Sequence, residues 1–213
     1  MDPLRIDIFS DVICPWCFLG KRQLERAMAE HRDTSFDVHF RPYLLNPDTP
    51  PEGVPRAEYF KTRFGSNPSA LDAAHARLGD LGAKVGIHFA FDRAERIPST
   101  IAAHAVIRWA AERNLAAAVV ERLFSAYFSE GRDLGDRATL AEVAADAGLD
   151  RDDVLERLAR EADFDAVREE ADAARIEGIT GVPFYVFGER LAVSGAQPPE
   201  VLSKVIVRAR QAS

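Results

Sequence analysis

The chain has 213 residues, of which 47% are hydrophobic and 29% are charged, as in folded proteins that bury a core. Its 27 Lys and Arg residues against 34 Asp and Glu residues give a formal net charge of −7. An acidic chain with scattered basic residues lacks the basic face of a nucleic-acid-binding or polybasic membrane-binding protein. No apolar run reaches the roughly 20 residues of a membrane-spanning helix. The N-terminus shows no signal-peptide pattern, so we predict a cytoplasmic location.

The first predicted elements are a strand, a helix and a second strand. Residues 4–9 alternate apolar and polar side chains, which is the period of a half-buried strand. Apolar residues recur at helical spacing over residues 18–29, and Pro15 suits the first turn of that helix. The alternation returns over residues 36–40. The chain therefore begins as β–α–β.

A Pro-rich connector over residues 46–53 marks a boundary, and the sequence beyond it is helical to about residue 178. Signals for helix starts stand at Asn67-Pro68, at Pro98-Ser99-Thr100, at a capping box of Thr139 with Glu142, and at the predicted N-caps Asp150 and Asp163. The helices that follow these signals are predicted to pack on one another.

Strand character returns in the last quarter. Residues 184–187 form a short aromatic and β-branched run, Gly188-Glu189 predicts a tight turn, and residues 191–193 predict the return strand of a hairpin. A terminal helix is predicted from Pro198-Pro199 onward. Its predicted apolar face consists of Val201, Leu202, Val205 and Ile206.

The two cysteines of the chain lie in one motif, Cys14-Pro15-Trp16-Cys17, where the first strand meets its helix. Neither can crosslink distant segments, which favours a chemical role. Unpaired N–H groups and the dipole at a helix N-terminus stabilise a thiolate, the form that attacks disulfides. We therefore predict Cys14 as the exposed nucleophile and Cys17 as the shielded resolving cysteine of a thiol–disulfide oxidoreductase.

Two alternatives concern the same motif. A Cys-x-x-Cys pair is half of a zinc site, which needs two further ligands. The chain has no second such pair, and its histidines, which we interpret as surface or packing residues, show no metal-ligand spacing: His31, His39, His75, His88 and His104. Two cysteines buried only for packing are the other alternative, but Pro-Trp between them directly after a strand favours redox chemistry.

Gly181-Val182-Pro183 stands directly before the aromatic strand. Proline is poorly tolerated inside a strand, so Pro183 is expected at a strand start or edge. Only about 5–6% of X–Pro bonds are cis, so these residues alone predict a trans bond.

The segment from Asp11 to Cys17, followed by Gly20-Lys21, resembles the active-site segment of the DsbA-like thioredoxin family, and most closely its cytosolic FrnE-type branch. Further stretches resemble that branch in the same order: Arg41-Pro42 to Asn46-Pro47, Ile97-Pro98, Gly178 to Pro183, and Ser194-Gly195-Ala196-Gln197.

The resemblance implies an α/β thioredoxin-like fold with an all-helical insertion domain. Residues 1–50 and 179–213 would form the thioredoxin-like core, and residues 51–178 the insertion. It also implies a cis proline at Pro183, beside the cysteines, and a backbone at Val182 that pairs with the substrate chain. Trp16 and Phe18 would offer an apolar rim to the site, and Trp16 stands where the periplasmic oxidants of the family carry His.

The predicted function is reversible exchange on protein or small-molecule disulfides, without a metal or organic cofactor and with glutathione as a candidate redox partner. The 2-hydroxychromene-2-carboxylate isomerases share this architecture and use a single Ser or Cys at the motif. A glutathione-dependent isomerase of this type is therefore the alternative. A chaperone-like protein that binds through an apolar cleft is the third hypothesis.

Overall fold

The computed structural model describes residues 2–65 and 69–211. Its main sheet has four strands in the order β2-β1-β5-β6: β1 (Leu4–Ser10), β2 (Phe36–Pro42), β5 (Phe184–Phe187) and β6 (Leu191–Ser194). β1 pairs parallel with β2 and antiparallel with β5, which in turn pairs antiparallel with β6. The two strands predicted from alternation are thus confirmed, as is the hairpin predicted from the aromatic run and the turn at Gly188-Glu189. The helix start predicted at Asn67-Pro68 lies outside the described residues.

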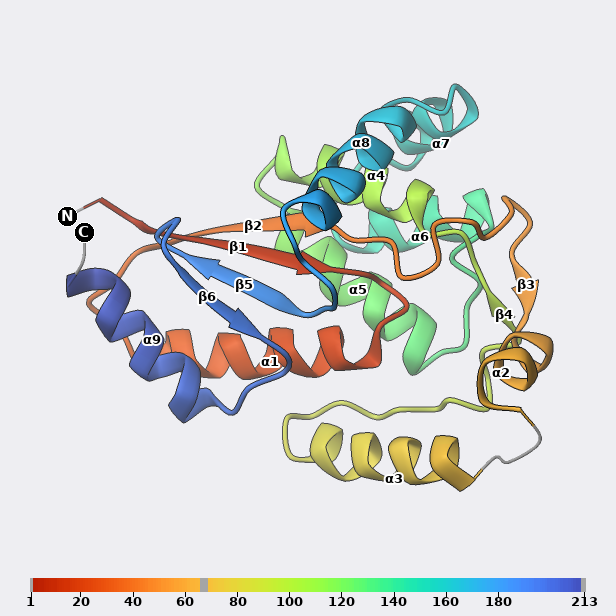
Figure 1. Cartoon of the computed structure of the whole chain (residues 1–213). Helices are drawn as coiled ribbons and strands as arrows, with labels where there is room; N and C mark the ends of the chain where they lie inside the picture. The colour runs from red at the N-terminus through yellow and green to blue at the C-terminus, as the bar shows by residue number, and fades with distance from the viewer. Residues whose placement is uncertain (1, 66–68, 212–213) are drawn as a thin grey trace.

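One face of this sheet is covered by α1 (Pro15–Ala29) and α9 (Pro199–Gln211), which lie side by side, and the other by helices from the middle of the chain (Figure 1). Ile6 pairs with Phe187 and Ile8 with Tyr185, and all four side chains are buried in the cluster beneath α1 and α9. The period of two in β1 and β5 therefore directs every second side chain toward these helices.

The region between β2 and β5 contains the remaining elements: β3 (Val54–Pro55), α2 (Arg56–Phe64), α3 (Ser69–Ala83), β4 (Arg96–Ile97), α4 (Ile101–Ala111), α5 (Ala116–Phe128), α6 (Arg137–Asp146), α7 (Arg151–Ala159) and α8 (Phe164–Ile176). β3 and β4 pair antiparallel into a small second sheet. Strands of two residues carry no readable period, so the sequence does not predict them. The fold is thioredoxin-like with a helical insertion, α4–α8, between β4 and β5. The domain boundaries after residue 50 and before residue 179 stay a prediction.

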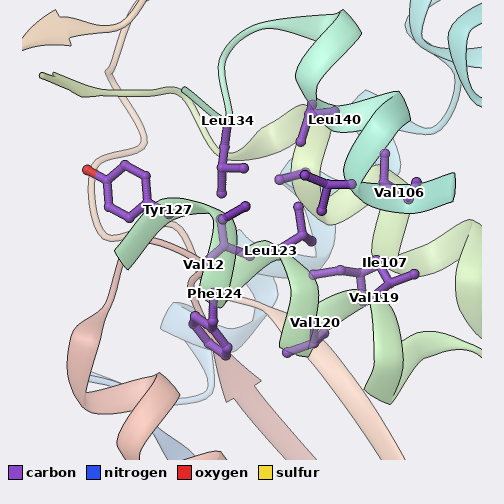
Figure 2. Close-up of a cluster of buried hydrophobic side chains, with 14 of the residues drawn as sticks. Val12, Val106, Ile107, Val119, Val120, Leu123, Phe124, Tyr127, Leu134 and Leu140 are labelled. Atoms are coloured by element: carbon purple, nitrogen blue, oxygen red, sulfur yellow. The ribbon is translucent and has the colours of Figure 1, made fainter. Parts of the chain in front are cut away.

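A hydrophobic cluster joins the segment before α1 to this helical insertion. Val12 belongs to one buried cluster with side chains of α4 and α5, and it lies near Leu123 and Phe124 of α5 (Figure 2). Cys14 belongs to the same cluster. The loop that carries the motif is therefore anchored by the helices as well as by β1.

Two of the predicted N-caps are wrong. The capping box of Thr139 with Glu142 does not form, because α6 begins earlier and Asp136 accepts hydrogen bonds from the backbone N–H groups of residues 138 and 139. Asp163 precedes α8 but has a left-handed backbone, with φ of 62°, and makes no side-chain cap. Its carboxylate instead accepts a hydrogen bond from Trp109 Nε1 at 2.7 Å. A tertiary partner has replaced the local one.

The predicted N-cap at Asp150 is confirmed, since its carboxylate accepts hydrogen bonds from the N–H groups of Asp152 and Asp153. The predicted apolar face of α9 is partly wrong. Leu202 is fully buried, whereas Val201 is 40% exposed because the buried stripe continues through Ile206 and Ala209 instead. None of the helices within residues 2–65 and 69–211 combines the length and apolar character that crossing a bilayer requires.

Candidate active site

The motif begins where β1 ends and α1 starts. Cys14 is the N-cap residue of α1, with an extended backbone at φ −94° and ψ 110°, and Pro15 takes the first helical position. The Cys14 N–H donates to the carbonyl of Asp11 at 3.0 Å, and the Cys17 N–H donates to the carbonyl of Cys14 at 3.0 Å. Both cysteines thus lie in the first turn of the helix, with Cys14 at its positive end.

Both cysteines are free thiols, and both are buried: 4% of Cys14 and 2% of Cys17 is exposed. The expectation that Cys14 is exposed is wrong. Its thiol lies 3.7 Å from the carbonyl oxygen of Val182, to which it donates, so the segment before β5 covers it. A substrate that reaches Cys14 therefore has to displace or pair with this segment.

The second thiol is held in its protonated form. Burial raises the pKa of Cys17 well above its usual range, and the hydrogen bond and charge of Cys14 act in the same direction. The backbone of Asp11 and the side chain of Ser10 lower this pKa without offsetting the burial. Cys17 is accordingly a shielded thiol at neutral pH.

The segment that carries Pro183 lies against the same helix. The Val182–Pro183 peptide bond is cis, and the carbonyl of Pro183 accepts a hydrogen bond from the N–H of Gly195 at 2.8 Å. The Pro183 ring reaches α1 at Gly20, where an added Cβ would lie 2.9 Å from Pro183 Cγ. The structure thus brings Val182 to Cys14 and Pro183 to the helix that carries the motif, although more than 160 residues separate the two segments in the chain.

The sequence did not single out Tyr185, which follows two positions after Pro183. Its hydroxyl is buried and has no hydrogen-bond partner among the described residues. Burial raises the pKa of Tyr185 well above its usual range, and the charges of Cys17 and Cys14 raise it further. The phenol oxygen lies against Gly20 of α1, where an added Cβ would stand 2.2 Å from it, so it lies on the inner side of the helix that carries the motif. An aromatic run predicts a strand but cannot reveal such a contact.

A second buried pair lies on the other side of the motif. Asp11 is fully buried, and its Oδ1 stands 3.5 Å from Nε2 of His104 on α4. Asp11 Oδ2 accepts a hydrogen bond from the N–H of Leu45 at 2.8 Å. Within the described part of the chain, neither Asp11 Oδ1 nor His104 Nε2 has a hydrogen-bond partner. The sequence assigned His104 only a surface or packing role, because its partner is distant in the chain.

Trp16 is half-buried beside the motif, with the Arg77 guanidinium 5.6 Å from the centre of its ring. Phe18 is buried in the hydrophobic cluster, so the expectation that it adds to an apolar rim is wrong. The described residues contain no group of three or more His, Cys, Asp or Glu side chains arranged to hold a metal ion. What the site offers chemically is therefore a pair of adjacent thiols, an apolar rim and the backbone of Val182.

The sheet has four strands and helices on both faces, the Cys-Pro-Trp-Cys motif begins the first helix, and Pro183 lies against that helix. These features together define a thioredoxin-like protein. The family model of the DSBA-like thioredoxin domain matches residues 5–207. The chain belongs to this family.

Comparisons with individual proteins agree with this assignment. The crystal structure of a probable DsbA oxidoreductase from Streptomyces coelicolor is 32% identical, with a TM-score of 0.89 over 99% of this chain and 91% of that chain. An uncharacterized protein of Bacillus subtilis, YwbO, is 27% identical over 95% of this chain and 96% of its own length. The cytosolic disulfide reductase DsbM from Pseudomonas aeruginosa, solved with GSH, has a TM-score of 0.69 at 19% identity, covering 97% of this chain and 99% of that chain. This last similarity supports the fold alone.

Proposed function

We propose that the protein exchanges thiols and disulfides, with Cys14 as the nucleophile and Cys17 as the resolving cysteine. The observation that carries the proposal is the pairing of two free thiols in the first turn of α1. Cys14 is the N-cap residue at the positive end of α1, whereas burial keeps Cys17 protonated. The two thiols thus have the unequal environments that the two steps of exchange require.

In the reducing direction, the Cys14 thiolate attacks one sulfur of a substrate disulfide. A bond forms between Cys14 and that sulfur, and the other substrate sulfur leaves as a thiolate that takes up a proton. Cys17 then loses its proton and attacks the Cys14 sulfur. The Cys14–Cys17 disulfide forms, and the second substrate thiol leaves. The substrate gains the two electrons that the dithiol loses, and the oxidising direction is the reverse.

We assign substrate binding to Trp16, Val182 and Pro183. The Val182 carbonyl already faces the Cys14 thiol at 3.7 Å, so an extended substrate chain bound to Cys14 would meet this backbone and pair with it as an added strand. The Trp16 ring, half-buried at the rim, would contact apolar groups beside the reacting sulfur. Protein or small-molecule disulfides both fit this arrangement.

The motif segment and the later stretches that resemble FrnE-type proteins lead us to place the chain in that cytosolic branch. Because the disulfide reductase of the same fold was solved with GSH, we also propose glutathione as a redox partner. The alternative is a glutathione-dependent isomerase, which needs one nucleophile and no resolving thiol. The pairing of Cys14 with Cys17 favours exchange, since an isomerase gives Cys17 no role.

Trapping on the two single cysteine variants tests the proposal. After incubation with glutathione disulfide, Cys17→Ser should accumulate a mixed disulfide on Cys14, seen as an added mass by intact-protein mass spectrometry, because nothing expels the bound thiol. Cys14→Ser should form no adduct and exchange nothing. Trapping by Cys14→Ser alone would reverse the roles. If Cys17→Ser instead turned over a 2-hydroxychromene-2-carboxylate substrate in the presence of glutathione as fast as the wild-type protein, the isomerase would be favoured.

A further inference from the structure

A small pocket opens beside the motif, between the start of α1 and the α2–β4 region. Its lining includes Ile13 and Pro15, the two chain neighbours of Cys14, together with Arg56, Phe60 and His75. Consecutive Cα atoms are about 3.8 Å apart, so the pocket lies within reach of a group a few bonds from a sulfur bound to Cys14. A substrate held as a mixed disulfide on Cys14 can therefore place a side group there.

Arg56 is the cation of this pocket. It opens α2, its backbone N–H donates to the carbonyl of Glu95 at 2.8 Å, and its guanidinium stands 4.6 Å from the centre of the Phe60 ring. Within residues 2–65 and 69–211 this guanidinium makes no ion pair and no side-chain hydrogen bond. Burial lowers the pKa of Arg56, although the charges of Tyr127 and Asp92 act against it.

A half-buried guanidinium with free N–H donors favours an anionic acceptor, because its lost hydration is otherwise uncompensated. The rest of the lining offers none. None of the lining residues is acidic, and the His75 ring is stacked on Phe91 at 4.1 Å. Burial and the charge of Arg56 lower the pKa of His75, so its imidazole is neutral at pH 7. The pocket combines one positive charge with aromatic and aliphatic walls.

We propose that this pocket binds a carboxylate of the thiol substrate, with Arg56 as its ligand. The inference rests on the proposed exchange reaction at Cys14. The cavity volume of about 60 Å³ holds on the order of four water-sized groups, which suits a carboxylate on a short stem. Two sources carry this chemistry near a reacting sulfur: the carboxylates of glutathione, and an acidic residue next to the cysteine of a protein substrate.

Exchange rates with pairs of disulfides that differ in the charge of one group test the proposal. The substrates are glutathione disulfide against its ethyl ester, and a Cys-Glu peptide disulfide against its Cys-Gln counterpart. Wild-type protein should prefer the acidic member of at least one pair by roughly tenfold, as expected for a charge-assisted hydrogen bond. Arg56→Met should abolish that preference by slowing only the acidic substrate. Arg56→Lys should keep part of it.

The matched control is Arg63→Met, which removes an exposed cation from the same helix, 6.0 Å from the Tyr59 ring and outside the pocket. It should leave the preference unchanged. The substrate pair between which Arg56→Met no longer discriminates, glutathione disulfide with its ester or the Cys-Glu with the Cys-Gln peptide, identifies the source of the carboxylate. Equal slowing of acidic and neutral substrates by Arg56→Met, or loss of the preference in Arg63→Met, would overturn the proposal.

Binding of unreactive ligands separates this proposal from the exchange reaction. S-methylglutathione and the S-methylated Cys-Glu peptide carry the same carboxylates without a reactive sulfur. Calorimetry should show that at least one binds wild-type protein roughly tenfold more tightly than Arg56→Met. If it does while wild-type exchange equals that of Cys14→Ser, the proposed function fails and the pocket stands. If exchange is normal but both ligands bind wild-type protein and Arg56→Met equally, the proposed carboxylate site is wrong and the proposed function is retained.

Discussion

The phenol oxygen of Tyr185 occupies the space where a side chain on Gly20 would begin: a Cβ there would lie 2.2 Å from Tyr185 Oη. Gly20 stands inside α1, three residues after Cys17, so one helical turn joins this contact to the resolving thiol. Glycine inside a helix is unfavourable by roughly 0.5–1 kcal/mol relative to alanine. The close approach of β5 to α1 explains why it stands there.

We therefore expect Gly20→Ala to destabilise the protein even though alanine is the better helix former. The new Cβ would overlap Tyr185 Oη and stand 2.9 Å from Pro183 Cγ, and such overpacking costs about 1–3 kcal/mol. Denaturant unfolding measures the change in free energy. The control is Gly79→Ala in α3, where a Cβ would have no neighbour within 4 Å and should stabilise the protein by up to about 1 kcal/mol. Equal gains from both variants would contradict the contact.

Tyr185→Phe should leave the free energy of unfolding unchanged or raise it. The variant removes a buried hydroxyl that lacks a hydrogen-bond partner among the described residues, and an unsatisfied group of this kind costs about 1–3 kcal/mol. The same variant should reduce the cost of Gly20→Ala, because the atom that a Cβ would meet at 2.2 Å is gone. A double-mutant cycle measures this coupling. Additive effects of the two substitutions would show that Oη is not the atom in the way.

Local patterns in the sequence were sufficient to predict the sheet and the motif. Alternation predicted β1, an aromatic and β-branched run predicted β5, and the Cys-Pro-Trp-Cys motif places both thiols in the first turn of α1. The burial of Cys14 was missed because the covering carbonyl comes from Val182, 168 residues away. A helix start predicts where a thiol lies along the chain, but not what is folded over it.

The roles of Asp11, His104 and Arg56 could not be predicted from the sequence for the same reason: their partners are distant in the chain. Asp11 and His104 stand 93 positions apart in the chain, and each alone is an ordinary polar residue. Arg56 follows a two-residue strand whose partner, β4, is about 40 positions further on. In these cases side chains gain their role from a tertiary neighbour, and a single sequence carries no signal for that pairing.

The Asp11–His104 contact predicts a stability effect. Removing the imidazole by His104→Leu leaves Asp11 Oδ1 buried without the polar atom that stands 3.5 Å away, and a buried polar group left without a partner costs about 1–3 kcal/mol. We expect a loss of that order in the free energy of unfolding. Asp11→Asn should recover part of it in the double variant, because an amide cannot ionise and costs less to bury than a carboxyl group. The control His88→Leu changes an exposed histidine and should alter stability little. Equal effects of His104→Leu and His88→Leu would argue against the contact.

Finally, the rate at which Cys17 resolves a mixed disulfide should rise with pH. Cys17 must lose its proton to attack Cys14, and burial holds the pKa of Cys17 well above its usual range. Below that pKa the thiolate fraction, and with it the rate, increases about tenfold per pH unit. Release of thionitrobenzoate from its adduct with Cys14, followed by absorbance between pH 6 and 9, measures this rate.

The same shift sets the sign of a stability effect in the reduced protein. A thiol whose pKa is higher in the folded than in the unfolded state stabilises the fold fully below the unfolded value of about 8.5, and this contribution is lost as the pH rises through the folded value. Reduced wild-type protein should therefore lose more stability than Cys17→Ala between pH 8 and 10 in denaturant unfolding. A release rate independent of pH, together with equal alkaline losses in both proteins, would show that Cys17 is not a shielded thiol, and the assignment of the resolving role would fall with it.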